Sequence, residues 1–235
     1  NTPTLPPATT TNCFIVGAER LFIIDPGAPN PEDQELLFEL LDELVAEGST
    51  LEAVVCTHHH PDHVGGVNAV SQRYDLPVHG YELTLDRLGE GFRRGQALED
   101  GDRLDLGVAP DGTPGWYLEA FFTPGHDRGH LVFRESRYGA LIAGDMISTV
   151  ATIMIDPPEG HLATYMKSLY RLRDLPMTTL YPAHGPATPN GKRIVEKFIK
   201  HREMRQTTLE VTLQETTGTV EDLLPIVYWD VKESM

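Results

Sequence analysis

The residue types best suited to chemistry gather in one short run, THHHPDHVGG, which directly follows the apolar segment LEAVV. Imidazole and carboxylate groups are the ligands that zinc and similar divalent ions prefer. His58 and His60 are two residues apart, so in an extended segment their side chains point the same way and can converge on one ion. A proline then turns the chain, and Asp62 and His63 fall near the start of the next helix. The run predicts a site for two metal ions.

Three single residues farther along the chain complete this set. His126 in TPGHDRGH, Asp145 in AGDM and His184 in PAHG each stand at the end of an expected strand or in the loop after it. Loops at strand ends are where an αβ scaffold places its chemistry. Two divalent ions would bring four positive charges against two negative charges from Asp62 and Asp145. The surplus would activate a metal-bound hydroxide and polarise a carbonyl or phosphoryl oxygen, with the two aspartates as catalytic residues.

Five other histidines are interpreted as structural or surface residues and not as metal ligands. His59 faces away from its neighbours by alternation, and His130 begins an apolar strand. His79, His161 and His201 are interpreted as surface or hydrogen-bonded residues.

Alternating strands and helices must position these residues, which indicates a layered α/β protein. Strands are expected at 13–17, 20–27, 51–57, 116–122, 130–134, 139–143 and 178–181, and helices at 31–46, 161–174 and 187–205. The expected catalytic domain spans residues 1–206. Residues 207–235 are expected to begin a small C-terminal helical appendage.

Composition excludes some functions and favours a compartment. The formal net charge is −16, which disfavours broad electrostatic binding to nucleic acid. A local exception is 190–206, with six basic and two acidic residues. No apolar run is long enough for a membrane span, and the N-terminal segment lacks signal-peptide features. Cys13 and Cys56 are interpreted as buried small hydrophobic residues, so a cytoplasmic protein with no membrane partner is expected.

Five motifs in order, IIDPG, THHHPDHVGG, TPGHDRGH, AGDM and PAHG, resemble the metallo-beta-lactamase superfamily over roughly residues 12–188. The resemblance implies an αββα four-layer sandwich with the metals at one edge. It further implies one ion held by His58, His60 and His126. The second ion would be held by Asp62, His63 and His184, with Asp145 bridging both. Asp25 would support the site without binding metal.

The tail and the segment IDPPEGHLATYMKSL are similar to the beta-lactamase-like protein 2 group. That group includes a single-stranded-RNA endoribonuclease and thioester-cleaving relatives, and its members carry a winged-helix-like appendage, which would be incomplete here. The leading hypothesis is therefore a dinuclear hydrolase that acts on an RNA phosphodiester or on a small-molecule ester or thioester.

Two alternatives stay open. A glyoxalase II-like thioester hydrolase is one, because THHHPDHVGG resembles that family's signature; a non-catalytic metal-binding module is the other. Zinc is the default metal, although iron or manganese also suits such ligands. The sequence leaves the exact substrate and the oligomeric state open.

Overall fold

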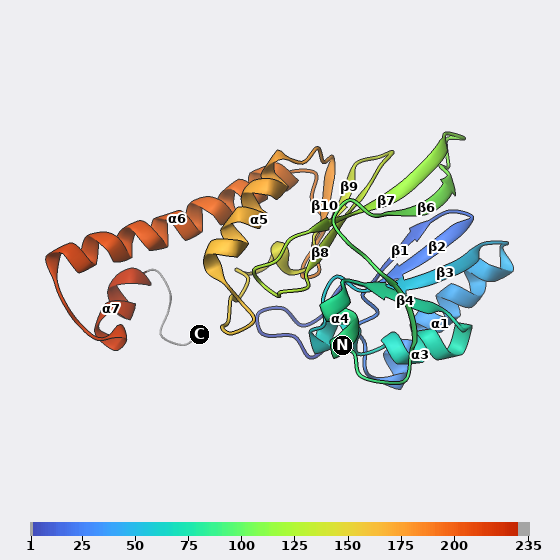
Figure 1. Ribbon diagram of the computed structural model, residues 1–235, viewed down its shortest axis with the longest axis horizontal. Coiled ribbons are helices and arrows are strands. Elements are labelled where there is room, and N and C mark those ends of the chain that lie inside the picture. Colours follow the sequence, from blue (N-terminus) through green and yellow to red (C-terminus); the bar gives the residue numbers. More distant parts are fainter. Residues whose placement is uncertain (1, 230–235) are drawn as a thin grey trace.

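Two five-stranded sheets lie face to face between outer helices in the computed structural model, which describes residues 2–229 (Figure 1). The side chains between the sheets come from both of them, among them Phe22 and Val55 from one and Leu118 and Phe133 from the other. This arrangement confirms the expected αββα sandwich. No helix within the described residues is long and apolar enough to cross a membrane.

The first sheet comes from the N-terminal half of the chain and has the order β1-β2-β3-β4-β5. β1 and β2 pair antiparallel, and the other neighbours pair parallel. Its strands are β1 (Phe14–Gly17), β2 (Arg20–Ile24), β3 (Thr50–Val55), β4 (Pro77–Gly80) and β5 (Arg93–Ala97). The helices of this half are α1 (Pro31–Ala46), α2 (Pro61–Val64), α3 (Val67–Tyr74) and α4 (Glu82–Arg87).

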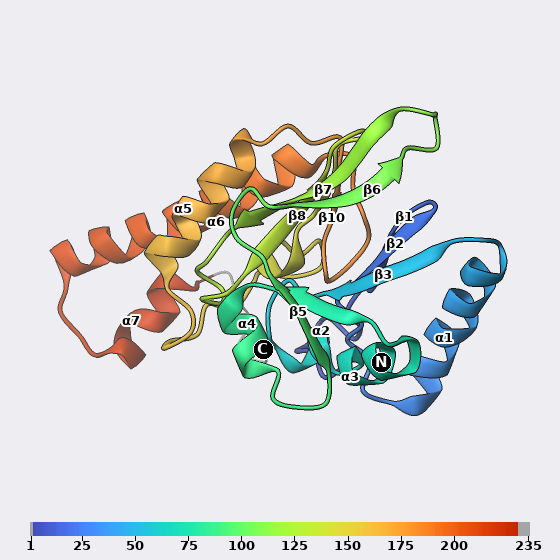
Figure 2. The ribbon, with the colours of Figure 1, turned by 45° about the vertical axis from the view of Figure 1, so that its right-hand side comes forward.

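The second sheet has the order β10-β9-β8-β7-β6, and only β9 and β10 pair parallel. Its strands are β6 (Arg103–Val108), β7 (Pro114–Phe122), β8 (Leu131–Glu135), β9 (Ala140–Ile142) and β10 (Thr179–Tyr181). A 3-10 turn, η1 (Gly144–Met146), follows β9. The long helices α5 (Leu162–Asp174) and α6 (Gly191–Glu215) cover its outer face (Figure 2).

Strand β2 shows how the sequence builds the layers. Its side chains alternate between the two faces of the sheet, as strand geometry requires. Phe22 and Ile24 pack between the sheets, whereas Ile23 packs outward with Leu41 of α1. Because both faces are covered, the strand is an almost continuous apolar run rather than an alternating one.

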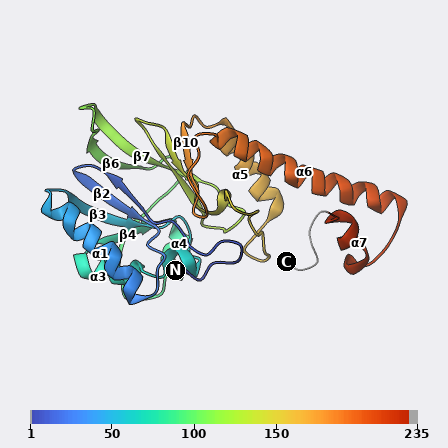
Figure 3. The ribbon, with the colours of Figure 1, turned by 180° about the vertical axis from the view of Figure 1, so that it is seen from behind.

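The C-terminal helices extend away from the sandwich (Figure 3). Helix α6 continues to Glu215, beyond the expected end at residue 205, so the proposed domain boundary at 206 falls inside a helix. Helix α7 (Val220–Val227) begins with a capping box between Thr219 and Asp222 and packs against α6. A helical appendage is therefore present. Its winged-helix character and the division into two domains stay predictions, and residues 230–235 lie outside the described part.

Several elements differ from the expectations. The strands β4, β5 and β6 and the helices α3 and α4 were not expected, because their segments are short or largely polar. The prediction for Cys13 was wrong: this residue is exposed and precedes the first residue of β1. Cys56 is buried at the end of β3, as expected.

Candidate metal centre

All seven predicted ligands lie together at one edge of the sandwich, in segments that follow strand ends. The run after β3 and its short helix α2 supply four of them. The loops after β7, β9 and β10 supply one each, so both sheets contribute. The seven residues are His58, His60, Asp62, His63, His126, Asp145 and His184.

The first donor group comprises His58, His60, His126 and Asp145, whose donor atoms all lie within 4.8 Å of one another. The Nδ1 atom of His60 lies 3.0 Å from Nε2 of His58 and 3.0 Å from Nε2 of His126. Bonds of ~2.0–2.1 Å to a tetrahedral zinc ion would separate two ligand nitrogens by about 3.3 Å. The three imidazoles therefore have nearly the spacing that one ion requires.

The second donor group comprises Asp62, His63 and His184. The Oδ2 atom of Asp62 lies 3.6 Å from Nε2 of His63 and 3.5 Å from Nε2 of His184. This group also can hold one ion, with two nitrogens and one oxygen.

Asp145 faces both groups. Its Oδ2 atom lies 3.4 Å from Nε2 of His126, in the first group. Its Oδ1 atom lies 3.1 Å from Nε2 of His184 and 3.5 Å from Nε2 of His63, in the second. One carboxylate thus spans the two groups, which is the geometry of a bridging ligand.

Asp25 and Thr57 fix the protonation of two imidazoles. The Oδ1 atom of Asp25 accepts the backbone N–H of Thr57 at 2.7 Å, and its Oδ2 accepts the Thr57 hydroxyl at 2.6 Å. His63 donates from Nδ1 to the same Oδ2 at 2.8 Å. Because the Thr57 hydroxyl already donates to Asp25, His58 donates from Nδ1 to Thr57 Oγ1 at 3.0 Å. This tautomer leaves both Nε2 atoms, which face the donor groups, available to a metal ion.

Backbone carbonyls fix the ring tautomer of the two candidate ligand histidines in the C-terminal half of the chain, His126 and His184. His126 donates from Nδ1 to the carbonyl of Met154 at 2.9 Å. His184 donates from Nδ1 to the carbonyl of Thr10 at 3.1 Å. Their Nε2 atoms are therefore free to bind a metal ion, in the orientation that such outer hydrogen bonds usually impose.

The electrostatics and the unpaired atoms fit a pair of divalent cations. Burial and the neighbouring His126 lower the pKa of His60 to about 4, so this imidazole is a neutral donor at neutral pH. Two fully buried atoms, Nε2 of His63 and Oδ1 of Asp145, lack a well-formed hydrogen bond within the described residues. Buried polar atoms rarely stay unsatisfied, and a cation between the donor groups would satisfy both.

Some supporting residues could not be found from the sequence. The Thr11 hydroxyl donates to Oδ2 of Asp62 at 2.9 Å. His130, interpreted as structural, accepts the backbone N–H of Asp145 at its Nε2 atom, 3.0 Å away. His59, which alternation predicted to face away from its neighbours, lies with Nδ1 2.8 Å from the buried carboxylate of Asp127; with His60 these two residues form a third group of donor atoms within 4.8 Å of one another. The sequence indicated the position of His59 only through its place between the two ligands of the HxH pair, and nothing in the sequence indicated Thr11.

A cleft of about 400 Å³ opens over the donor groups. The N-terminal segment 3–8 forms one wall and the loop 148–159 forms another. Beyond the donor residues, the part of its lining that the structure describes is mostly small or apolar, with two acidic side chains and no lysine or arginine: Pro3, Thr4, Leu5, Pro6, Ala8, Pro61, Ser148, Ala151, Thr152, Ile153, Met154, Asp156, Pro157, Pro158 and Glu159.

Known proteins are similar to this chain in sequence and in fold. A beta-lactamase-like protein 2 homolog of Caenorhabditis elegans is 31% identical over 210 residues, which cover 87% of this chain and 66% of that protein. A hydroxyacylglutathione hydrolase of Thermosynechococcus vestitus is 33% identical over 158 residues, covering 67% of this chain and 55% of that protein. The chain thus spans less than two thirds of the length of these curated relatives.

The crystal structure of TTHA1623 in a di-iron-bound form superposes with a TM-score of 0.60 at 28% identity, covering 82% of this chain and 96% of that one. The family model for the metallo-beta-lactamase superfamily matches residues 6–184, which include Asp25 and all seven donor residues. The chain therefore belongs to the metallo-beta-lactamase superfamily.

Proposed function

We propose that this protein is a dinuclear-metal hydrolase that cleaves an uncharged ester-type carbonyl bond, with a thioester as the leading substrate class. One ion is held by His58, His60 and His126, and the other by Asp62, His63 and His184. Asp145 is shared between them, and zinc is the default metal for these ligands. Family membership and the two donor groups support this proposal.

The chain's own residues supply position and orientation for this reaction. A pair of divalent ions, when bound, supplies Lewis acidity and makes water a usable nucleophile at neutral pH. Asp62 and Asp145 would hold the ions and help to orient that nucleophile toward the substrate carbonyl. His130 and Asp25 hold ligands in place: His130 accepts the backbone N–H of Asp145, and Asp25 accepts a hydrogen bond from the ring of His63.

The observation that carries the substrate class is the charge of the cleft. Among residues 2–229, lysine and arginine are absent from its lining, while Asp156 and Glu159 are part of it, Glu159 being ion-paired with Arg87. A phosphodiester backbone would bring further phosphates toward these carboxylates, which like charges disfavour. A neutral acyl group suits a lining that is mostly small and apolar and carries no described cation.

The test is a substrate panel with metal-loaded protein: an acyl thioester, S-lactoylglutathione, a lactone and single-stranded RNA. We expect thioester hydrolysis that a chelator abolishes and added zinc restores. Asp62→Ala should lower kcat/KM by about a thousandfold, as for loss of a group that acts on the reacting atoms. The control Glu39→Gln, on the exposed side of α1, should change nothing. Activity that survives chelation would contradict the metal mechanism.

Single-stranded RNA is the second candidate, since six basic residues within 190–206 interrupt an otherwise acidic chain. A higher kcat/KM for RNA than for the thioester in the same panel would reverse the ranking. Rapid turnover of S-lactoylglutathione alone would favour the narrower glyoxalase II-like alternative.

A further inference from the structure

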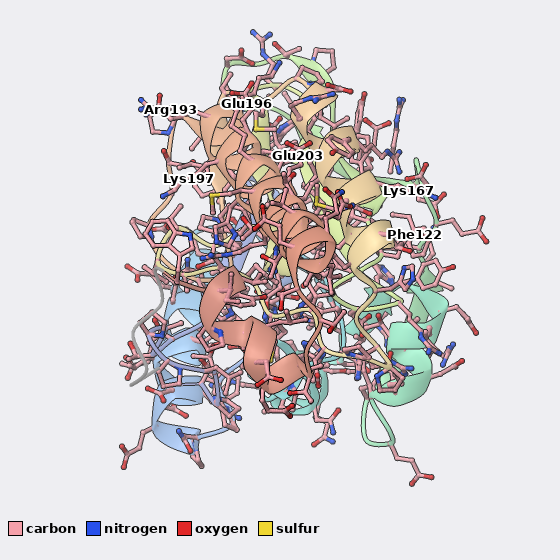
Figure 4. The ribbon with its side chains drawn as sticks, turned by 90° about the vertical axis from the view of Figure 1, so that its left-hand side faces the viewer. Phe122, Lys167, Arg193, Glu196, Lys197 and Glu203 are labelled. Atoms are coloured by element: carbon pink, nitrogen blue, oxygen red, sulfur yellow. The ribbon has the colours of Figure 1, made fainter. Side chains whose placement is uncertain are left out.

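Three basic side chains lie along one face of α6, and we call them the basic stripe: Arg193, Lys197 and Lys200. Their spacing of four and then three residues places them on the same side of a helix. All three are exposed. Figure 4 shows Arg193 and Lys197 projecting together from the side of α6 that faces away from α5.

The basic stripe has one carboxylate beside it, that of Glu196, but forms no ion pair with it in the described structure. Within residues 2–229 none of its three members makes an ion pair or a hydrogen bond to an acidic side chain. Other basic residues of this acidic chain do so; Arg94, for example, pairs with Glu82 and Asp86. Three cations beside one carboxylate leave this face locally positive on a chain of net charge −16, and such a face attracts a compact anion.

The stripe borders the metal centre through the loop after η1. Ser148, Ala151 and Thr152 line the metal cleft and also line a second hollow of about 270 Å³ on the other side of this loop. Lys197 and His201 of α6 form the opposite wall of that hollow. A shallow depression along α6 shares Lys197 and His201 with that hollow; its lining includes Arg193, Lys197 and Lys200 of the basic stripe and one acidic residue, Glu196.

The two regions differ in charge. The described lining of the cleft is mostly small or apolar, with two acidic residues, whereas the hollow beyond the loop contains Lys197 of the basic stripe and no acidic residue among the described ones. A continuous polyanion would have to place phosphates in both regions. A ligand that is uncharged at its reacting end and carries phosphates only at its far end matches both.

We propose that the basic stripe binds the phosphates of a nucleotide-type leaving group, so that the substrate is a thioester whose thiol portion bears phosphates. This inference rests on the proposed function. In the reaction, a water oxygen forms a bond to the acyl carbon and the carbon–sulfur bond breaks. The products are a carboxylic acid and a free thiol, which takes up the remaining proton of the water.

The first experiment compares two thioesters with the same acyl group, acetyl-coenzyme A and S-acetyl-N-acetylcysteamine, which lacks phosphates. In the triple variant Arg193→Gln/Lys197→Gln/Lys200→Gln, KM for the coenzyme A thioester should rise by about tenfold or more while kcat holds, because charge-assisted contacts to phosphate are lost. The truncated thioester should be unaffected. Lys167→Gln is the matched control, since this exposed lysine projects from α5 on the opposite side (Figure 4).

The second experiment needs no turnover: binding of adenosine 3′,5′-bisphosphate, measured by calorimetry. The wild-type chain should bind it, the triple variant should bind it at least about tenfold more weakly, and Lys167→Gln should match the wild type. If neither thioester is hydrolysed but this difference persists, the proposed function fails and the phosphate site stands.

Two outcomes would overturn the inference. One is an unchanged KM for both thioesters together with equal bisphosphate binding in wild type and triple variant. The other is a triple variant that loses single-stranded RNA binding yet keeps bisphosphate binding, which would make the stripe a nucleic-acid surface instead.

Discussion

Asp25 illustrates how a residue outside the donor groups controls them. Its carboxylate accepts three hydrogen bonds, two from Thr57 and one from His63. The bond from His63 fixes which ring nitrogen carries the proton. Loss of such outer partners typically weakens metal binding without removing a ligand.

We expect Asp25→Asn to weaken metal affinity by about 10–100-fold, because the amide lacks the charge and the full acceptor capacity of the carboxylate. Competition with a chelator of known affinity measures this change. Glu39→Gln removes a carboxylate of α1 that lies on the surface and should leave the affinity unchanged. Equal affinities for Asp25→Asn and wild type would show that the tautomer of His63 is fixed by other groups.

Thr11 should act only on the second donor group. Its hydroxyl bonds Asp62 and makes no bond to the first group. Thr11→Val should therefore lower occupancy toward one ion per chain in limiting metal, whereas Thr11→Ser, which keeps the hydroxyl, should stay near the wild-type value. Metal content measured by mass spectrometry decides this. Equal loss in both variants would point to packing rather than to the hydrogen bond.

The candidate ligands could be predicted from the sequence because their residue types and spacing are themselves the signal. The partners that orient them could not. Every residue has a backbone carbonyl, so nothing in the sequence marks those of Thr10 and Met154. Only the folded chain shows which carbonyl faces which imidazole. Thr11 is more than fifty residues from Asp62 and belongs to a segment without an apolar pattern.

Among the elements, α6 and α7 are joined through one buried arginine. Arg205 donates from Nη1 to the carbonyl of Val227 at 2.6 Å, and its guanidinium lies 4.8 Å from the centre of the Tyr228 ring. The bonded carbonyl is at the end of α7, where helices leave carbonyls without partners in the helix.

Arg205→Ala should release α7 from α6, because a charge-assisted hydrogen bond of roughly 1.5–3 kcal/mol and the ring contact are both lost. We expect faster cleavage by a nonspecific protease in the segment 216–219, with the sandwich intact by circular dichroism. Gln206→Ala, at the adjacent exposed position, is the control. Unaltered cleavage would mean that apolar contacts alone hold α7.

At this scale the sequence was partly misleading. Helix α6 was expected to end at residue 205, but it continues to Glu215 and is capped by Thr216, in the segment TTGT. β5 was missed because RRGQA has no apolar face, and indeed its residues are exposed or half-buried. Strands with a continuous apolar run, such as β2, β3 and β8, were expected.

For the whole molecule, the metal centre is also a link between layers. The sandwich arrangement was inferred from the order of five motifs rather than from periodicity, which indicates strands but not which sheets face each other. The donor residues come from segments that follow both sheets, so bound ions would tie the two sheets together.

Removal of metal should therefore lower thermal stability. Ions at a hundred times their dissociation constant contribute about 2.7 kcal/mol to the folded state. For a chain of this size that is a drop in Tm of about 5–10 °C on chelation, measured by scanning calorimetry. Asp145→Asn, which disturbs both donor groups, should show a smaller drop. Identical curves with and without chelator would contradict a metal link between the sheets.

The position of Asp145 between the two donor groups would couple the binding of two ions. An ion in one group would share this carboxylate with an ion in the second group, so each would change the affinity for the other by the same factor. The two sites would then not fill independently. When metal is scarce, the fractions of empty, singly and doubly filled molecules would differ from those of two independent sites. A plot of activity against free metal concentration would be steeper or shallower than simple saturation.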